Sequence, residues 1–457
     1  MATIHQNEKG DYANKDWLPH VMVYLGFLTT AISVPASSAL IHRFAYVVYV
    51  ALFTYLLARN SLVLHRKVTY LLVSLLLFSL YAASTGINEL PTVAKTFSGL
   101  FLLHIALFSY FAYYKHNYRL LLGHYLTIAK LVAAVGIIQE LSFLVGFEPG
   151  WNLSRLYIGQ LNYEELVSQT ASSSVMRISS FFSEPGYLAA GLSPAAYLAV
   201  NNFATGNKEY LKEAWSAVII VALFFTLSTI GYIAIILSIA FNLRRKQLLR
   251  AIIPLIGITS VGWWAVTSVS FFQSRAEGLV SILITQDATG YENASAILYA
   301  MNGEIARQNV LARPMIGSGF DSFKGTAMEA LNSNSLPNAF QVYASAQPIE
   351  YLNFADGMTM YFRSITEFGL IGTGLIIFLF YRHRCNPINH QARILQNMCI
   401  VFFLTYSFRT GQYIRFELWY FIGMYFCIYK KSLAEIRNTP LTTEQNFLPN
   451  KWHAQSH

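Results

Sequence analysis

An arginine and a glutamate at the start of an apolar stretch are the first residues in this chain that could do chemistry. The segment RISSFFSEPGYLAAG (177–191) places Arg177 seven positions before Glu184. Pro185 and Gly186 follow directly. Pro185 is predicted to be the first helical residue, where its missing N–H has no helical partner to lose. The planar guanidinium of arginine suits phosphate or carboxylate because it makes paired hydrogen bonds, and a carboxylate beside it can handle a proton. The segment predicts a catalytic anion site; in the alternative interpretation, the two residues pair with each other and pin the loop to the helix.

Four further arginines beside apolar stretches extend this candidate site. They are Arg275, Arg363, Arg409 and Arg415. A charge at the centre of a bilayer costs about 2.5–3.5 kcal/mol, so arginines at a membrane boundary need a compensating anion. We predict that, together with Arg177, they bind the diphosphate of a lipid-linked ligand. In the alternative interpretation each side chain reaches into water or pairs with a nearby acid, which we expect for Arg155, Arg307 and Arg313.

Two acidic residues near position 360 are candidates for proton transfer or for charge pairing. Asp356, in NFADGM (353–358), is a candidate general base for an acceptor hydroxyl, and a helix cap is the alternative role. Glu367 is expected to pair with Arg363, one helical turn before it.

The composition indicates what surrounds these residues. Of the 457 residues, 54% are hydrophobic and only 12% are charged, whereas a typical soluble protein has about 25% charged residues. Apolar runs of the length needed to cross a bilayer, roughly 20 residues, recur along the chain. We therefore predict an all-α polytopic membrane protein that forms a single membrane domain (1–457), with the lipid bilayer as a partner.

Charge, cysteine and glycine patterns exclude several other classes. The net charge of +9 is explained by basic residues that flank helices on the cytoplasmic side, so no nucleic-acid partner is predicted. Cys385, Cys399 and Cys427 have neither disulfide nor metal-ligand spacing, and no metal is predicted. Gly317 and Gly319 lack the strand–turn–helix context of a nucleotide loop and predict a tight turn.

Basic clusters set the predicted orientation. They lie at 59–67, 115–119, 208–212, 244–250, 382–393 and 430–431. Placing all of them in the cytoplasm predicts about twelve transmembrane helices. The predicted spans are 21–40, 44–58, 68–85, 96–113, 120–146, 186–203, 209–228, 230–249, 251–270, 364–381, 394–408 and 416–429.

The same orientation predicts the segments outside the spans. Residues 147–185 form a periplasmic loop, residues 271–363 form a large periplasmic loop, and residues 432–457 form a cytoplasmic tail. A loop longer than about 15 residues usually has a function of its own.

Residues 209–249 need a reversal to fit this orientation. One continuous helix would carry the basic cluster at 244–250 to the outer side. We therefore predict two helices with a tight turn at 228–231.

Four short segments, in order, resemble the Wzy-type polymerases of bacterial O-antigen, capsule and exopolysaccharide. These polymerases share a superfamily with the O-antigen ligases. The segment at 177–186 resembles the family's arginine-to-Glu-Pro-Gly element, and FFTLSTIGYIAIIL (224–237) is similar to its LTxSRxG span. PMIGSGFDSF (314–323) resembles its PxxGxGxxxF element, and YFRSITEFGLIGTG (361–374) its ELGLIG entry to a span. The resemblance covers roughly residues 120–430.

The resemblance implies an enzyme with a GT-C-like fold in the bacterial inner membrane, with its active site facing the periplasm. It would transfer a growing glycan from undecaprenyl diphosphate to a lipid-linked repeat unit, with inversion at the anomeric carbon. Arginines would stabilise the charge of the departing diphosphate. The implied partners are the undecaprenyl-diphosphate-linked oligosaccharide, a chain-length regulator and a flippase, and the reaction needs no cofactor.

This chain also departs from the family pattern. Thr229 follows Ser228 where the family has an arginine, so Arg275 or Arg409 is expected to take over that role. The His-Asn pair of the ligases, just before the ELGLIG element, is missing, and Asp356 is the nearest ionisable candidate.

Two alternatives remain open. An O-antigen ligase is disfavoured by the missing His-Asn pair. A transporter or lipid flippase is compatible with twelve spans, but the large loop spoils the symmetric halves that many transporters show.

Overall fold

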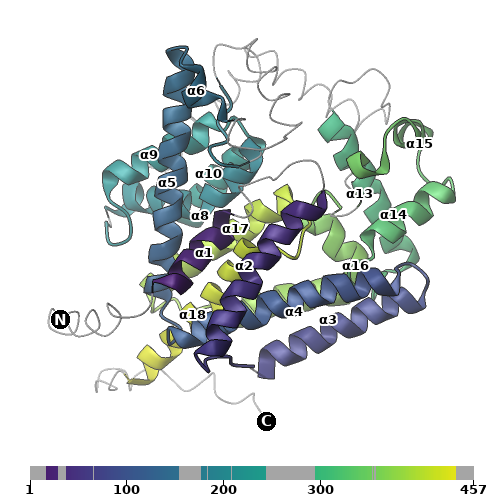
Figure 1. Ribbon diagram of the computed structural model, residues 1–457, viewed down its shortest axis with the longest axis horizontal. Helices are drawn as coiled ribbons and strands as arrows, with labels where there is room; N and C mark the ends of the chain where they lie inside the picture. Colours follow the sequence, from purple (N-terminus) through teal and green to yellow (C-terminus); the bar gives the residue numbers. More distant parts are fainter. Residues whose placement is uncertain are drawn as a thin grey trace, which may run out of the picture.

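The protein is described by a computed structural model that covers residues 17–28, 38–64, 66–153, 176–182, 184–206, 208–242, 294–352, 354 and 357–438. Within these ranges the chain is all-helical and contains no strand. Figure 1 shows α13, α14 and α15 together at the right, with α5, α8, α9 and α10 at the left. The helices do not form a parallel bundle, because α3 and α4 lie across the view while α5 stands upright.

The helix boundaries follow the apolar runs of the sequence. In the first part they are α1 (Leu18–Leu28), α2 (Ser38–Ala58), α3 (Arg66–Ser84), α4 (Leu90–Tyr113), α5 (Tyr118–Leu144), α6 (Glu148–Trp151), α8 (Pro185–Thr205), α9 (Glu213–Phe225) and α10 (Thr229–Asn242). In the second part they are α13 (Ala294–Ala312), α14 (Phe323–Asn332), α15 (Asn338–Ser345), the 3-10 helix η3 (Ile349–Leu352), α16 (Met360–Arg382), α17 (His390–Arg409) and α18 (Phe416–Asn438).

Three helices of the described chain are long and apolar enough to cross a membrane. They are α4, α5 and α16, with 24, 27 and 23 residues. At 1.5 Å per residue, α4 and α5 are each longer than the hydrocarbon core of a bilayer is thick, about 30 Å. A helix overlaps every predicted span except 251–270, which lies outside the described residues. The all-α prediction is confirmed, whereas twelve spans and a GT-C-like arrangement stay predictions.

The predicted reversal is present, but it lies at 226–228 rather than at 228–231, because α10 begins at Thr229. Helix α9 runs antiparallel to α8. Near the end of α8, Asn202 Nδ2 donates to Leu211 O (2.8 Å), just before α9 begins. The last residue of α9, Phe225, lies beside the segment that precedes α8. Helix α10 then runs parallel to α8, and Asn242 Nδ2 donates to Tyr197 O (3.4 Å). The two helices therefore reverse direction between Phe225 and Thr229.

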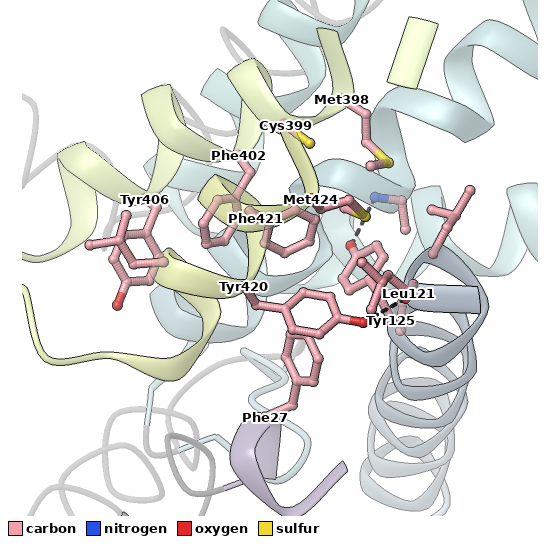
Figure 2. Packing of buried hydrophobic residues seen from close by; sticks show 14 of the residues in the cluster. Phe27, Leu121, Tyr125, Met398, Cys399, Phe402, Tyr406, Tyr420, Phe421 and Met424 are labelled. Atoms are coloured by element: carbon pink, nitrogen blue, oxygen red, sulfur yellow. Dashed lines mark hydrogen bonds between the residues drawn. The ribbon is translucent and has the colours of Figure 1, made fainter. Parts of the chain in front are cut away.

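Helix α8 contains a proline, and a core side chain bridges the resulting gap in the hydrogen-bond ladder. Pro194 has no N–H to donate, and it interrupts the hydrogen-bond ladder of the helix. The Tyr125 hydroxyl bridges the gap, because it donates to Gly191 O and accepts from Ala195 N (both 2.9 Å). Figure 2 shows Tyr125 among the aromatic side chains of α1, α17 and α18 that form this core.

The described part of the large loop, from residue 294, folds as a separate helical unit. Its core consists of side chains from α13, α14, α15 and η3, including Met301, Phe323, Phe340 and Leu352. This unit belongs to the predicted large loop.

Two of the family-like segments lie against each other. Helix α16 is broken at Gly369, which has φ +59°. The segment at 314–320 inserts beside the break, where Ser318 N donates to Thr366 O and Gly319 N to Glu367 O (both 2.9 Å). A Cβ on Gly317 would lie 2.5 Å from Thr366 O, so this approach requires glycine. The predicted tight turn is confirmed, whereas the span predicted at 364–381 is not a continuous helix.

Candidate functional site

The start of α8 carries the Glu-Pro-Gly element. Glu184 has extended backbone angles and Pro185 is the first helical residue, as the sequence predicts. The Glu184 side chain does not cap the helix. It forms an ion pair with Arg409 at the end of α17. Within the described residues, Glu184 thus pairs with Arg409 and not with Arg177.

Tyr187, one turn into α8, lies beside two of the predicted arginines. The guanidinium carbon of Arg409 is 3.9 Å from the centroid of its ring, and that of Arg415 is 5.5 Å away. The face of an aromatic ring attracts a cation at these distances. The ring therefore helps to hold two cations close together beside the N-terminus of α8, where the helix dipole also favours an anion.

The absence of a side chain at Gly186 leaves space for the Arg409 side chain. A Cβ at this position would lie 2.8 Å from Arg409 Nε and 3.6 Å from Ser228 Oγ. Arg409 and Ser228 thus meet over the same glycine. This contact favours Arg409 over Arg275 as the substitute for the family arginine that would follow Ser228.

Arg177 lies in a buried, irregular segment that α5 holds in place. Ser179 N and Ser180 N both donate to Gln139 Oε1, at 3.1 and 3.0 Å. Met176 N donates to the carboxylate of Glu140, which is itself buried. Arg177 interacts electrostatically with Tyr232, one turn after Ser228 in α10. The segment therefore places Arg177 on the same side of α8 as the α9–α10 reversal.

Gln139 and Glu140 were missed by the sequence reasoning. A Gln-Glu pair late in a long apolar helix is the one available signal, because buried polar side chains need partners.

Arg363 is engaged elsewhere. It forms ion pairs with Asp321 and Glu367, and only 5% of its side chain is exposed. Its Nη1 also donates to Gly411 O (3.0 Å). The expected pair with Glu367 is confirmed, while Asp321 was not anticipated. Two carboxylates therefore already face the buried guanidinium of Arg363.

A small cavity lies below Tyr187 and Arg415. Its volume is about 30 Å³, and its polar lining includes Arg415 and Glu417 among apolar side chains. Figure 2 shows several of its aromatic walls, including Phe27, Tyr125 and Phe402. A cavity of this size holds one or two water molecules, since about 10–15 Å³ suffices for one. The cavity is therefore too small for a diphosphate, whereas the carboxylate of Glu184 is 44% exposed.

The remaining candidates fall into two groups. Arg155, Arg275 and Asp356 lie outside the described residues. Arg307 and Arg313 pair with Glu304 and Glu329, as expected of surface arginines. In the part of the chain that the structure describes, no group of three or more His, Cys, Asp or Glu residues could hold a metal ion.

The site therefore consists of Glu184, Tyr187, Arg409 and Arg415. Arg177 lies in the segment that contacts α5, and its described interaction is with Tyr232. A comparison with protein-family models found no match, and a comparison with curated proteins found no significant match.

Proposed function

We propose that this protein is a membrane glycosyltransferase, a polysaccharide polymerase of the Wzy type in the bacterial inner membrane. It transfers a growing glycan from undecaprenyl diphosphate to a lipid-linked repeat unit on the periplasmic face. One observation carries the proposal: Arg409 pairs with Glu184, and both Arg409 and Arg415 lie over the Tyr187 ring, although the two segments are more than 200 positions apart. A cluster of this kind suits a diphosphate better than a neutral ligand.

The ion pair of Glu184 and Arg409 suggests how the reaction proceeds. In the absence of ligand, the carboxylate balances the guanidinium. When a diphosphate binds, Arg409 exchanges the carboxylate for phosphate oxygens, and Glu184 becomes available as a base. The acceptor hydroxyl gives its proton to Glu184 while its oxygen attacks the anomeric carbon. The bond from that carbon to the diphosphate oxygen breaks, and the arginines stabilise the departing charge.

The positions of the connecting segments support the proposed orientation. Segments predicted to be cytoplasmic lie together, since Gln391 Nε2 donates to Glu209 Oε2 and Asn389 Nδ2 to Glu435 Oε2 (both 2.9 Å). The segments predicted to be periplasmic also lie together, because Arg363 reaches both Gly411 O and Asp321. The proposed site is therefore on the side away from the basic clusters, as the positive-inside rule expects.

The decisive experiment is the ladder of glycans on the carrier lipid, from cells with and without the protein. Loss of a polymerase leaves single repeat units on the carrier. Loss of a ligase would strand full-length polymer there, and loss of a transporter would leave the distribution of chain lengths unchanged. Either of the latter two results contradicts the proposal. Purified protein given lipid-linked repeat units should extend them without any added nucleotide sugar.

A further inference from the structure

The segment at 314–320 has an unusual place for irregular backbone. It lies inside the break of α16 and against α3, where Phe320 N donates to Phe78 O (3.3 Å). Leu370 N and Ile371 N, freed by the break, donate to Pro314 O and Met315 O at 2.9 and 3.1 Å. The segment and the two helices thus satisfy one another's backbone groups.

The positions of the contact along α16 and α3 give its distance from one end of each helix. Leu370 is twelve positions before Arg382, the last residue of α16. Phe78 is twelve positions after Arg66, the first residue of α3. Twelve residues of α-helix rise about 18 Å. Both helices therefore place the segment at most about 18 Å from their basic ends, within a hydrocarbon core that is about 30 Å thick.

The two basic ends lie on the same side of the molecule. Tyr425 Oη donates to Phe380 O (2.6 Å), near the end of α16. Two residues later, Cys427 Sγ lies 3.6 Å from His116 Nδ1, just after α4. The α4 end in turn contacts the approach to α3, where Val63 N donates to Ser109 Oγ (3.0 Å). The two distances of about 18 Å, along α16 and along α3, therefore start from the same side of the molecule and agree.

The side chains of the segment fit a lipid surrounding. Met315 and Ile316 are 55% and 52% exposed, and neither carries a charge. Next to them, Leu370 and Ile371 at the break begin the exposed apolar surface of α16, which continues through Ile377. Irregular backbone is tolerated at membrane depth only where protein satisfies its polar groups, and here the α16 break and α3 do so.

We propose that residues 314–320 form a re-entrant segment whose Met315 and Ile316 side chains contact lipid acyl chains inside the hydrocarbon core. The helical unit of α13–α15 is thereby fixed to the membrane rather than suspended above it. This inference depends on the membrane orientation in the proposed function, but not on the reaction. Its failure would leave the glycan ladder unchanged, so the two proposals can fail separately.

Site-directed fluorescence in lipid nanodiscs tests the proposal. An environment-sensitive fluorophore is attached to M315C, with V342C and I377C as matched variants. Val342 on α15 is 53% exposed, close to the value for Met315, and Ile377 on α16 is 65% exposed. The native cysteines are buried, so exposed single cysteines react first.

The three labels separate the outcomes. The M315C label is expected to behave like the I377C label: quenched by doxyl groups on the acyl chains and protected from aqueous iodide. The V342C label is expected to show the reverse. If the M315C label is quenched by iodide as strongly as the V342C label, the segment lies in water and the proposal is wrong. I316C repeats the measurement should M315C fail to fold.

Discussion

Arg409 at the end of α17 pairs with Glu184 at the start of α8, and 225 positions of sequence separate them. The pair joins the two segments that bear the proposed chemistry. In the proposed reaction, an anion that competes for Arg409 releases Glu184 from this pair.

Substituting Arg409 should separate binding from folding. In R409A, we expect long-chain product to fall by about 10²–10³-fold, since a positioned donor to the transition state is lost. R409K keeps the charge but loses the planar fork, and it should recover only part of the activity. The measurement is the glycan ladder together with the thermal midpoint of the purified protein.

The matched control is R307A. Arg307 forms a surface ion pair with Glu304 and is 61% exposed, so its loss should change neither chain length nor stability appreciably. If R409A makes glycans of wild-type length, Arg409 is not part of the site.

Replacing Gly186 with any larger residue should reduce activity. In G186A, the new Cβ would lie 2.8 Å from Arg409 Nε, so the guanidinium must move away from Ser228. We expect a folded protein with shortened or absent polymer. G123A is the control, because a Cβ there meets nothing within 4 Å and alanine favours helix. If G186A and G123A both polymerise normally, the position of Arg409 over Gly186 is not required.

Local patterns predicted much of the fold but few of its long-range pairs. The start of α8 at Pro185 and the reversal before Thr229 follow from proline chemistry and charge placement, both of which are local. The partner of Glu184 does not, because nothing near a residue specifies which distant arginine will meet it. The interpretation that Arg177 pairs with Glu184 failed for this reason.

The break in α16 illustrates a second limit. The sequence FGLIGTG looks like the entry to an ordinary span, and small residues are common there. Only the structure shows that Gly369 adopts φ +59° to receive the 314–320 segment. Similarly, Arg363 and Glu367 could be paired by helical spacing, but their third partner Asp321 comes from a different segment.

The Tyr125 hydroxyl should contribute measurably to stability. In Y125F, Gly191 O and Ala195 N lose the hydroxyl that bridges them at Pro194 inside the core. A buried group left without its hydrogen bond costs about 1–3 kcal/mol. We expect a lower thermal midpoint in detergent and reduced polymerisation at elevated temperature only.

The control for this substitution is Y70F, at a tyrosine that is 69% exposed. An unchanged thermal midpoint in Y125F would show that α8 does not depend on the bridge.

Arg363 should prove to be a folding residue rather than a ligand for phosphate. R363M leaves the buried Glu367 and the partly buried Asp321 without their cation, and removing one partner of a buried ion pair costs about 3–5 kcal/mol. We expect R363M to reduce the amount of folded protein sharply, unlike R409A. Neutralising both acids in the same chain (R363M with D321N and E367Q) should restore folding, because no unpaired charge then remains. The thermal midpoint and the yield of folded protein measure this restoration. If the triple variant folds but makes no polymer, Arg363 also binds substrate. If the triple variant makes long polymer, the role of Arg363 is to hold the 314–323 segment against α16.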